Sequence, residues 1–410
     1  MSRSDSIVCG LDVGTTKICA IIGELNADGV VDIIGVGTSP SRGLRRGVVV
    51  NIDLTVSSIK KAMDDAELMA GRRSESVFAG ISGGHIKGIN AHGVIAIKNR
   101  EVTTNEVARV IDAARAVAIP LDREVIHILP QEFVVDDQGG IREPVGMAGV
   151  RLEAKVHIIT GAVSAAQNII RCAHRSGLTV NDLVLQQMAA AEAVLSPDEK
   201  ELGVALIDIG GGTTDLAVFI EGAIQHTAVI PVGGDQLTND IAVGLRTPTG
   251  EAEKIKKRYG CALANLVNRD ETIHVPGVGG RQPRVLAKSV LAEITEPRLE
   301  EILGLAKREM EKYNILRSVA SGIVLTGGSV AIQGVVELAE QIFDMPVRFG
   351  YPVGVSGLVD VVNSPVYATG VGLALWGTRH GCADLSESYE SGRVLNRFYE
   401  RMKRWFTEAF

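Results

Sequence analysis

The 410-residue sequence has few cysteines and no long apolar run. Its five cysteines lie singly among apolar residues and form no C-x-x-C pair, which predicts reduced, buried thiols and argues against disulfides or zinc. The first six residues form a short polar segment, so no signal peptide is expected. The apolar stretch at 366–376 is below the roughly 20 residues that a membrane span needs. This pattern is typical of a cytoplasmic protein.

The composition also argues against a nucleic-acid binder. Lysine and arginine are outnumbered by acidic residues, and the net charge is -7 at pH 7. Aromatic residues are only 4%, whereas apolar residues make up 46% of the chain. The many alanines, valines, isoleucines and glycines favour α/β sheets with closely packed helices. The eight histidines show no H-E-x-x-H spacing.

The sequence lacks the G-x-x-x-x-G-K-[ST] loop, but it carries another glycine-rich pattern twice. Residues 10–17 read GLDVGTTK and residues 207–215 read IDIGGGTTD, each between two apolar runs. This predicts two β-hairpins whose tips bind phosphate through backbone N–H groups. One copy alone is equally consistent with an ordinary hairpin. The candidate nucleotide-binding residues are Gly10, Asp12, Gly14, Thr15, Thr16, Lys17, Asp208, Gly210, Gly211, Gly212, Thr213 and Thr214.

Each pattern has an aspartate at the end of its first strand. Asp12 and Asp208 are therefore the predicted ligands of Mg²⁺, which prefers a few carboxylates together with phosphate oxygens. Two such tips facing each other would hold a nucleoside triphosphate from both sides.

Two further elements are candidates for the nucleoside. A strand runs into a Gly-Gly turn at residues 322–329, and a helix over 251–259 carries Glu253 and Lys256 on one face. Taken alone, Glu253 and Lys256 fit a solvated surface pair better. The candidate residues of these elements are Glu253, Lys256, Gly327, Gly328 and Ser329, and Gly234 is a further candidate nucleotide-binding residue.

These elements, in this order, resemble the superfamily of actin, sugar kinases and heat-shock chaperones. Within it, residues 127–133 (HILPQEF) and the segment from Gly140 to His157 are similar to the FtsA family of bacterial cell-division proteins. The resemblance covers essentially the whole chain. It implies an α/β fold of actin-like tandem duplicated domains around a cleft that binds ATP and Mg²⁺, with an FtsA-type insertion subdomain.

The sequence pattern divides the chain accordingly. We expect a first core subdomain, a second core subdomain, two insertions, a linker and a C-terminal helix. Their residues are 1–82, 163–200 and 362–378 for the first core; 83–162 for the FtsA-type insertion; 201–241 and 321–361 for the second core; 242–320 for a helical insertion; 379–392 for the linker; and 393–410 for the helix.

The candidate catalytic residue is Gln186. Related ATPases carry a glutamate at about this position, where it orients the attacking water. An amide cannot act as a base and positions water less well. We therefore expect ATP binding with at most weak hydrolysis. Moving the assignment by one residue, to Gln187, would not change this expectation, because that residue is also an amide.

The C-terminal segment 393–410 has a strong amphipathic pattern. Its apolar residues fall within an arc of roughly 160° at helical spacing. It carries a net charge of +3, whereas the rest of the chain carries -10. This predicts a helix on anionic lipid, and the FtsA resemblance implies the same. Docking on the protein's own core is the alternative. The candidate membrane-binding residues are Leu395, Arg397, Phe398, Arg401, Met402, Arg404, Trp405 and Phe406.

The resemblance also implies partners and a location. The C-terminal peptide of FtsZ is expected at the second insertion, where Arg298 and Glu301 match the positions used; by spacing alone they are a surface i, i+3 pair. Later division proteins are expected at residues 83–162. Self-association into polymers is expected at the cytoplasmic face of the cell membrane, at the division site.

Two alternatives differ in class from this interpretation. A sugar or acetate kinase of the same superfamily would not need the basic aromatic tail, and a chaperone would need a further domain after residue 380. Residues 80–84 (GISGG) also match the nucleophile elbow of hydrolases. That motif requires a helix directly after the serine, whereas residues 85–89 predict a strand.

Overall fold

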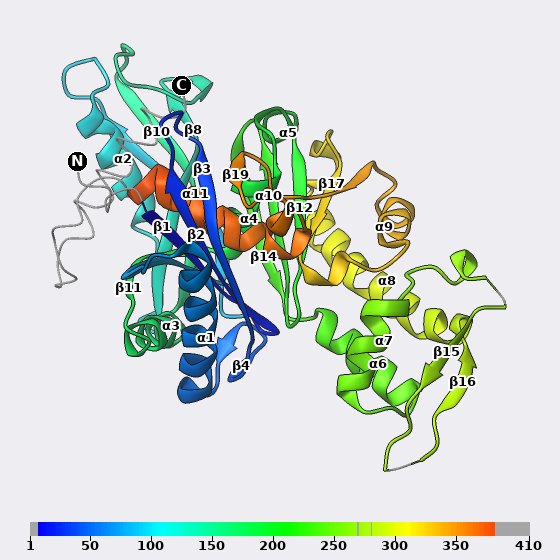
Figure 1. Cartoon of the computed structure of the whole chain (residues 1–410). Helices are drawn as coiled ribbons and strands as arrows, with labels where there is room; N and C mark the ends of the chain where they lie inside the picture. The colour runs from blue at the N-terminus through cyan, green and yellow to red at the C-terminus, as the bar shows by residue number, and fades with distance from the viewer. Residues whose placement is uncertain (1–6, 269, 280, 382–410) are drawn as a thin grey trace.

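A computed structural model describes residues 7–268, 270–279 and 281–381, arranged as two sheet-based halves with two smaller subdomains (Figure 1). The predicted tail helix at 393–410, and the predicted linker from residue 382 onward, lie outside the described residues.

The first half is built on a six-stranded sheet in the order β11-β6-β1-β2-β3-β19. β1, β2 and β3 form an antiparallel meander, and β6 joins β1 in parallel. The bounds are β1 Ile7–Val13, β2 Lys17–Leu25, β3 Val31–Pro40, β6 Ser76–Ile81, β11 Thr179–Leu185 and β19 Val355–Gly357, with a small ribbon of β4 Leu44–Arg45 and β5 Val48–Val49. Its helices are α1 Ile52–Ala70, α3 Val163–Arg175, α4 Gln186–Val194, α10 Val359–Val362 and α11 Ala368–Gly381.

The second half repeats this arrangement in a five-stranded sheet of order β14-β13-β12-β17-β18. Its first three strands again form an antiparallel meander, and β17 joins β12 in parallel, as β6 joins β1. The repetition confirms the predicted tandem duplication. The bounds are α5 Pro197–Leu202, β12 Val204–Ile209, β13 Thr214–Ile220, β14 Ala223–Ile230, β17 Ile323–Thr326, α9 Val335–Phe343 and β18 Val347–Phe349.

Small residues allow α4 and α11 to pack closely between the two halves. A Cβ atom built on Gly372 would lie 1.7 Å from the carbonyl oxygen of Ala189, so the α11 backbone rests on the α4 backbone. The alanines at 189–191 are completely buried. Larger side chains at these positions would force the helices apart.

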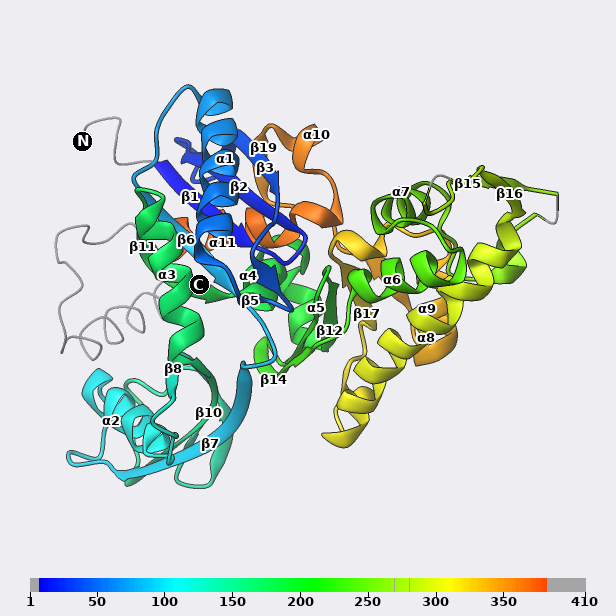
Figure 2. The same cartoon turned by 90° about the horizontal axis from the view of Figure 1, so that it is seen from below.

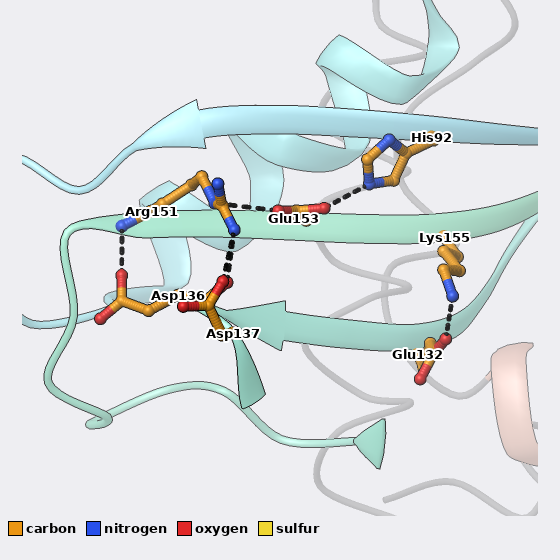
Figure 3. A network of polar contacts seen from close by, with 7 residues as sticks. All are labelled: His92, Glu132, Asp136, Asp137, Arg151, Glu153 and Lys155. Carbon is orange, nitrogen blue, oxygen red and sulfur yellow. Dashed lines mark hydrogen bonds and ion pairs between the residues drawn. The ribbon is translucent and has the colours of Figure 1, made fainter. Parts of the chain in front are cut away.

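The first insertion has a four-stranded sheet in the order β7-β10-β8-β9, with α2 packed on one face. Its other face carries a ladder of ion pairs (Figure 3). Its helix α2 ends at Arg115, before Pro120. The bounds are β7 Lys87–Ala96, α2 Thr104–Arg115, β8 Arg123–Val135, β9 Gln138–Ile141 and β10 Arg151–Ala162.

The second smaller subdomain is not purely helical. A hairpin, β15–β16, accompanies its helices, and its first helix begins before residue 242. The short strands of this hairpin lie in a segment where apolar alternation is weak, so the sequence pattern did not indicate them. The bounds are α6 Gly234–Gly244, α7 Thr249–Tyr259, β15 Thr272–Val275, β16 Arg284–Ala287 and α8 Lys288–Lys312.

Of the helices in the described part of the chain, none is both long enough and apolar enough to span a membrane.

Candidate functional site

The first hairpin, β1–β2, ends in the predicted glycine and threonine turn. Gly14 donates its N–H to the carbonyl of Lys17 at 3.1 Å and closes the turn. Asp12 is buried near the end of β1, and it accepts a hydrogen bond from Gln186 Nε2 at 3.0 Å. Burial raises the pKa of Asp12, and the charge of Lys17 partly offsets this. The predicted catalytic residue thus contacts a predicted metal ligand.

The second hairpin, β12–β13, has the same form. Gly210 donates its N–H to the carbonyl of Thr213 at 2.9 Å. Asp208 is buried and accepts a hydrogen bond from Thr369 of α11 at 3.1 Å. Burial raises the pKa of Asp208 to about 7, and the nearby carboxylates of Asp215 and Asp12 contribute to this rise. Burial and the neighbouring carboxylates therefore destabilise the charged form of Asp208.

The two hairpin tips meet. Thr16 Oγ1 donates to Asp235 Oδ1 at 3.1 Å, in the first turn of α6, which follows β14. A Cβ atom on Gly211 would lie 1.8 Å from Thr16 Oγ1, and one on Gly212 would lie 2.7 Å from Thr15 Oγ1. Only glycine allows so close an approach. Residues 10–17 and 207–215, almost 200 positions apart in sequence, therefore form one site.

The Gly-Gly turn joins the same site. Gly327 has a φ of 95°, and a Cβ atom there would lie 2.2 Å from Asp208 Oδ1. Ser329 donates its hydroxyl to the carbonyl of Gly210 at 2.9 Å. By contrast, a Cβ atom on Gly328 would meet nothing within 4 Å. The turn therefore contacts the second hairpin on one side and has open space at Gly328.

Lys256 is buried, which differs from the solvated pair that the sequence alone favours. Its Nζ lies 2.7 Å from Glu253 Oε2 and donates to the carbonyl of Gly234 at 3.1 Å and to Thr238 Oγ1 at 2.8 Å. Because Gly234 also lies against Ser329, this group continues the site from the Gly-Gly turn onto α6 and α7.

Lys17 connects the first hairpin to the segment before α11. Its Nζ donates to the carbonyl of Val366 at 2.7 Å and lies 4.7 Å from the centre of the Tyr367 ring. The positive charge lowers the pKa of both Asp12 and Asp208, against the effect of burial.

Asp215 is a member of the site that sequence reasoning did not include. It is buried on β13 directly opposite Asp208 of β12, and it accepts hydrogen bonds from Ser82 and, at 3.0 Å, from Thr213. Burial raises its pKa to about 6. The register of the hairpin could have identified Asp215. Asp208 and Asp215 are equally far from the tip at 210–213, so they face each other across the two strands.

Ser82 belongs to the segment that resembles a nucleophile elbow. β6 ends at Ile81 and the next element is the strand β7, so the helix that such an elbow requires does not follow. The Ser82 hydroxyl instead donates to Asp215.

Arg298 and Glu301 lie on α8, in a second location. They are hydrogen-bonded to each other, and Arg298 Nε lies 2.5 Å from Asp240 Oδ2 of α6. With Ile294 and Pro297 they line a surface pocket of about 200 Å³. A larger pocket of about 590 Å³ lies elsewhere, between α3 and the start of β8.

The geometry suits an anionic ligand accompanied by a cation. Glycine turns of this kind can present backbone N–H groups to an anion, and the carboxylates of Asp12, Asp208 and Asp215 are buried close to one another. Within the described residues, no cluster of three or more histidine, cysteine or acidic side chains could hold a metal on its own. A cation at Asp12 and Asp208 would therefore need ligands from a bound molecule or from water, as Mg²⁺ usually has.

Comparison with known proteins identifies the family. The family model "Cell division protein FtsA" matches residues 205–372, and the model "SHS2 domain inserted in FTSA" matches residues 83–160. The cell-division protein FtsA of Pseudomonas aeruginosa is 54% identical over 413 residues, covering 100% of this chain and 99% of that protein. The chain belongs to the FtsA family. FtsA of Escherichia coli K12 is 41% identical over 98% of both chains.

Solved structures support the actin-like fold expected for an FtsA-family protein. The PilM–PilN type IV pilus biogenesis complex has a chain that matches with a TM-score of 0.67 at 16% identity, covering 92% of this chain and 99% of that one. MreB5 of Spiroplasma citri, solved bound to ADP, matches with a TM-score of 0.54 at 15% identity, covering 90% and 96%. The predicted fold class and the FtsA resemblance are confirmed.

The buried carboxylate of Asp208 leads to a prediction about stability. Its pKa is about 7 in the folded chain and ordinarily 3.8, so the folded state binds this proton more tightly. The resulting stabilisation is present below about pH 4 and is lost as the pH rises through 7. Asp208→Asn, which stays neutral, should exceed the unsubstituted protein in free energy of unfolding by roughly 2–4 kcal/mol at pH 8.

Urea unfolding at pH 4 and pH 8, without nucleotide or Mg²⁺, measures this difference. The difference in free energy of unfolding between the two proteins should shrink towards zero at pH 4. Asp28→Asn, in an exposed turn, is the control and should change stability by less than about 0.5 kcal/mol at either pH. An Asp208→Asn variant that is less stable than the unsubstituted protein at pH 8 would contradict the assignment.

Proposed function

We propose that this FtsA-family protein binds ATP with Mg²⁺ between its two hairpin tips, self-associates, and anchors the FtsZ ring to the cytoplasmic face of the cell membrane. Later division proteins would be recruited through residues 83–162. The observation that supports nucleotide binding is the direct contact of the two hairpin tips, Gly211 with Thr16 and Gly212 with Thr15. Glycine turns of this kind can bind anions, so two of them side by side would hold a phosphate chain from both sides.

Several features support ATP·Mg as the ligand. The pKa values of Asp12 and Asp208 are raised, so a divalent cation there would relieve the repulsion. Bound Mg²⁺ would supply charge neutralisation for phosphate oxygens. Glu253 and Lys256 lie next to the Gly-Gly turn, where they would flank the nucleoside. The MreB5 structures, which share the fold, were solved with ADP or AMPPNP.

Gln186 is placed to affect hydrolysis. Its amide donates to Asp12, beside the proposed metal position, but an amide cannot take a proton from water. We therefore propose that turnover is slow and that the protein acts mainly through its nucleotide-bound state.

The pocket at Arg298 is the proposed site for the FtsZ tail. Ile294 and Pro297 give it an apolar part, and Arg298 and Glu301 give it charges of both signs. A short peptide with apolar and charged side chains fits such a surface, on a subdomain distinct from the hairpin tips. Residues 393–410, with their basic and aromatic side chains, are the proposed membrane anchor.

The ATP site is tested by combining Asp208→Ala with Gly328→Asp. The first removes a proposed metal ligand, and the second extends a negative charge into the open space at Gly328. Fluorescent-ATP titration with Mg²⁺ should show at least about tenfold weaker binding, with an unchanged circular-dichroism spectrum. Gly250→Asp, where a Cβ atom also meets nothing within 4 Å, is the control. Unchanged affinity in the double variant would refute the site.

The FtsZ site is tested by Arg298→Glu. Charge reversal should weaken binding of the FtsZ C-terminal peptide by about three- to tenfold in fluorescence anisotropy, because the pair with Asp240 and the pocket charge are both lost. ATP affinity should not change. Arg308→Glu, exposed on the same helix, controls for net charge. The proposal fails if only substitutions within 83–162 weaken peptide binding.

The membrane anchor is tested by separating its apolar and charged contributions in liposome sedimentation. Trp405→Glu with Phe406→Glu places charge on the apolar face and should release the protein at any salt concentration. Arg401→Ala with Arg404→Ala should weaken binding mainly on anionic vesicles and flatten its salt dependence. Deleting 393–410 should abolish binding and leave ATP affinity unchanged. Survival of liposome binding, or unfolding of the truncated protein, would argue that the anchor lies elsewhere.

A further inference from the structure

The first insertion contacts the second half of the molecule, although its chain enters and leaves through the first half. Gln131 of β8 donates its side-chain amide to the carbonyls of Ile224 at 2.9 Å and Gln225 at 3.3 Å. Asn90 of β7 donates to the carbonyl of Gln225 at 3.3 Å. All three contacts end on the backbone of β14, beside which the insertion lies (Figure 2).

His157 makes a further connection from β10. Its Nε2 lies 2.8 Å from Thr227 Oγ1 of β14, and its Nδ1 lies 2.5 Å from Asn90 Oδ1. Burial lowers the pKa of His157 to about 3, and the nearby His226 contributes to this lowering. The ring is therefore neutral at physiological pH: it accepts from the Thr227 hydroxyl and donates to Asn90. Both ring nitrogens are used.

Arg142 connects the end of β9 to the same half. Its guanidinium donates to Glu201 Oε2 at 2.5 Å and to the carbonyl of Glu221 at 2.6 Å. Glu221 lies in the turn between β13 and β14. The contacts thus extend along the length of β14, from this turn to Thr227.

β14 is the outer strand of its sheet, paired with β13 alone among the strands of that sheet. The insertion's side chains use carbonyl groups that an outer strand would otherwise leave to water. β13 in turn begins with Thr214 and Asp215 at the second hairpin tip. Asp215 is bonded to Ser82, the residue directly before the insertion. The hairpin tip is therefore connected to the insertion at two places, through Ser82 and through β14.

We propose that these contacts couple the nucleotide site to the first insertion, so that a nucleoside triphosphate with Mg²⁺ at the second hairpin changes the mobility of the insertion. This rests on the nucleotide site proposed above. Because β13 and β14 are one hydrogen-bonded ribbon, ordering the tip orders β14 and whatever is bonded to it. By linkage, a partner that holds the insertion in place strengthens nucleotide binding by the same factor.

The test is hydrogen exchange of the full chain, followed by mass spectrometry, with and without ATP and Mg²⁺. In the unsubstituted protein, ATP·Mg should slow exchange in β12–β13 and also in β7 and β8 of the insertion. The expected slowing in the insertion is about two- to tenfold, the range that one or two net hydrogen bonds give. Gln131→Leu with Thr227→Val removes two of the donors to the interface at similar side-chain volume. This double variant should bind ATP with unchanged affinity, but ATP·Mg should no longer slow hydrogen exchange in the insertion.

One control and a second test variant separate coupling from general loosening. His92→Ala removes the hydrogen bond to Glu153 in the same sheet (Figure 3) and leaves the bonds from Asn90, Gln131 and His157 to β14 in place, so it should keep the slowing. Gln131→Leu alone is the second test variant if the double variant unfolds, and it should lose part of the slowing.

The outcomes are distinguishable. Slowing in β12–β13 without slowing in the insertion would overturn the coupling and leave the nucleotide site standing. The coupling is likewise overturned if the insertion still responds in the double variant. If ATP·Mg slows exchange nowhere, the nucleotide site itself is wrong, and the coupling with it.

Discussion

The close contact between the two hairpin tips is the constraint on which the rest of the site depends. With Gly211 and Gly212 against Thr16 and Thr15, no side chain larger than hydrogen fits on the second tip. The approach brings the strand ends together and therefore brings their aspartates together. Burial and mutual repulsion raise the pKa of Asp208 to about 7, and burial raises that of Asp215 to about 6. The fold thus gathers carboxylates whose charge Lys17 offsets only in part.

Local pattern was enough to predict the parts of this arrangement that are short-range. The strands β1, β2, β12 and β13 lie where the apolar runs beside the glycine turns indicate, because a hairpin is specified by its turn residues and by alternation next to them. Lys17, Gly210 and Ser329 then followed from the same motifs. Repetition of the motif also predicted that two equivalent halves face each other.

Contacts between segments far apart in sequence could not be predicted in this way. Thr369 bonds to Asp208 across 161 positions and Ser82 bonds to Asp215 across 133. Thr369 does not stand out in its own segment, and Ser82 stands out only as a match to the nucleophile elbow, which predicts a different role. The burial of Lys256 depends likewise on Gly234 and Thr238 of the preceding helix. The docking of the first insertion on β14 depends on single side chains such as Gln131, whose role becomes visible only once the strands are placed.

The placement of the aspartates also gives Gln186 a second role. A glutamate there would sit roughly 3 Å from Asp12 in a buried site that already holds Asp208 and Asp215. Like charges at such distances raise one another's pKa values, so a fourth carboxylate would either take up a proton or repel Asp12. The glutamine instead donates a hydrogen bond that stabilises the charged form of Asp12. An amide at this position therefore avoids the repulsion that a further carboxylate would bring to Asp12.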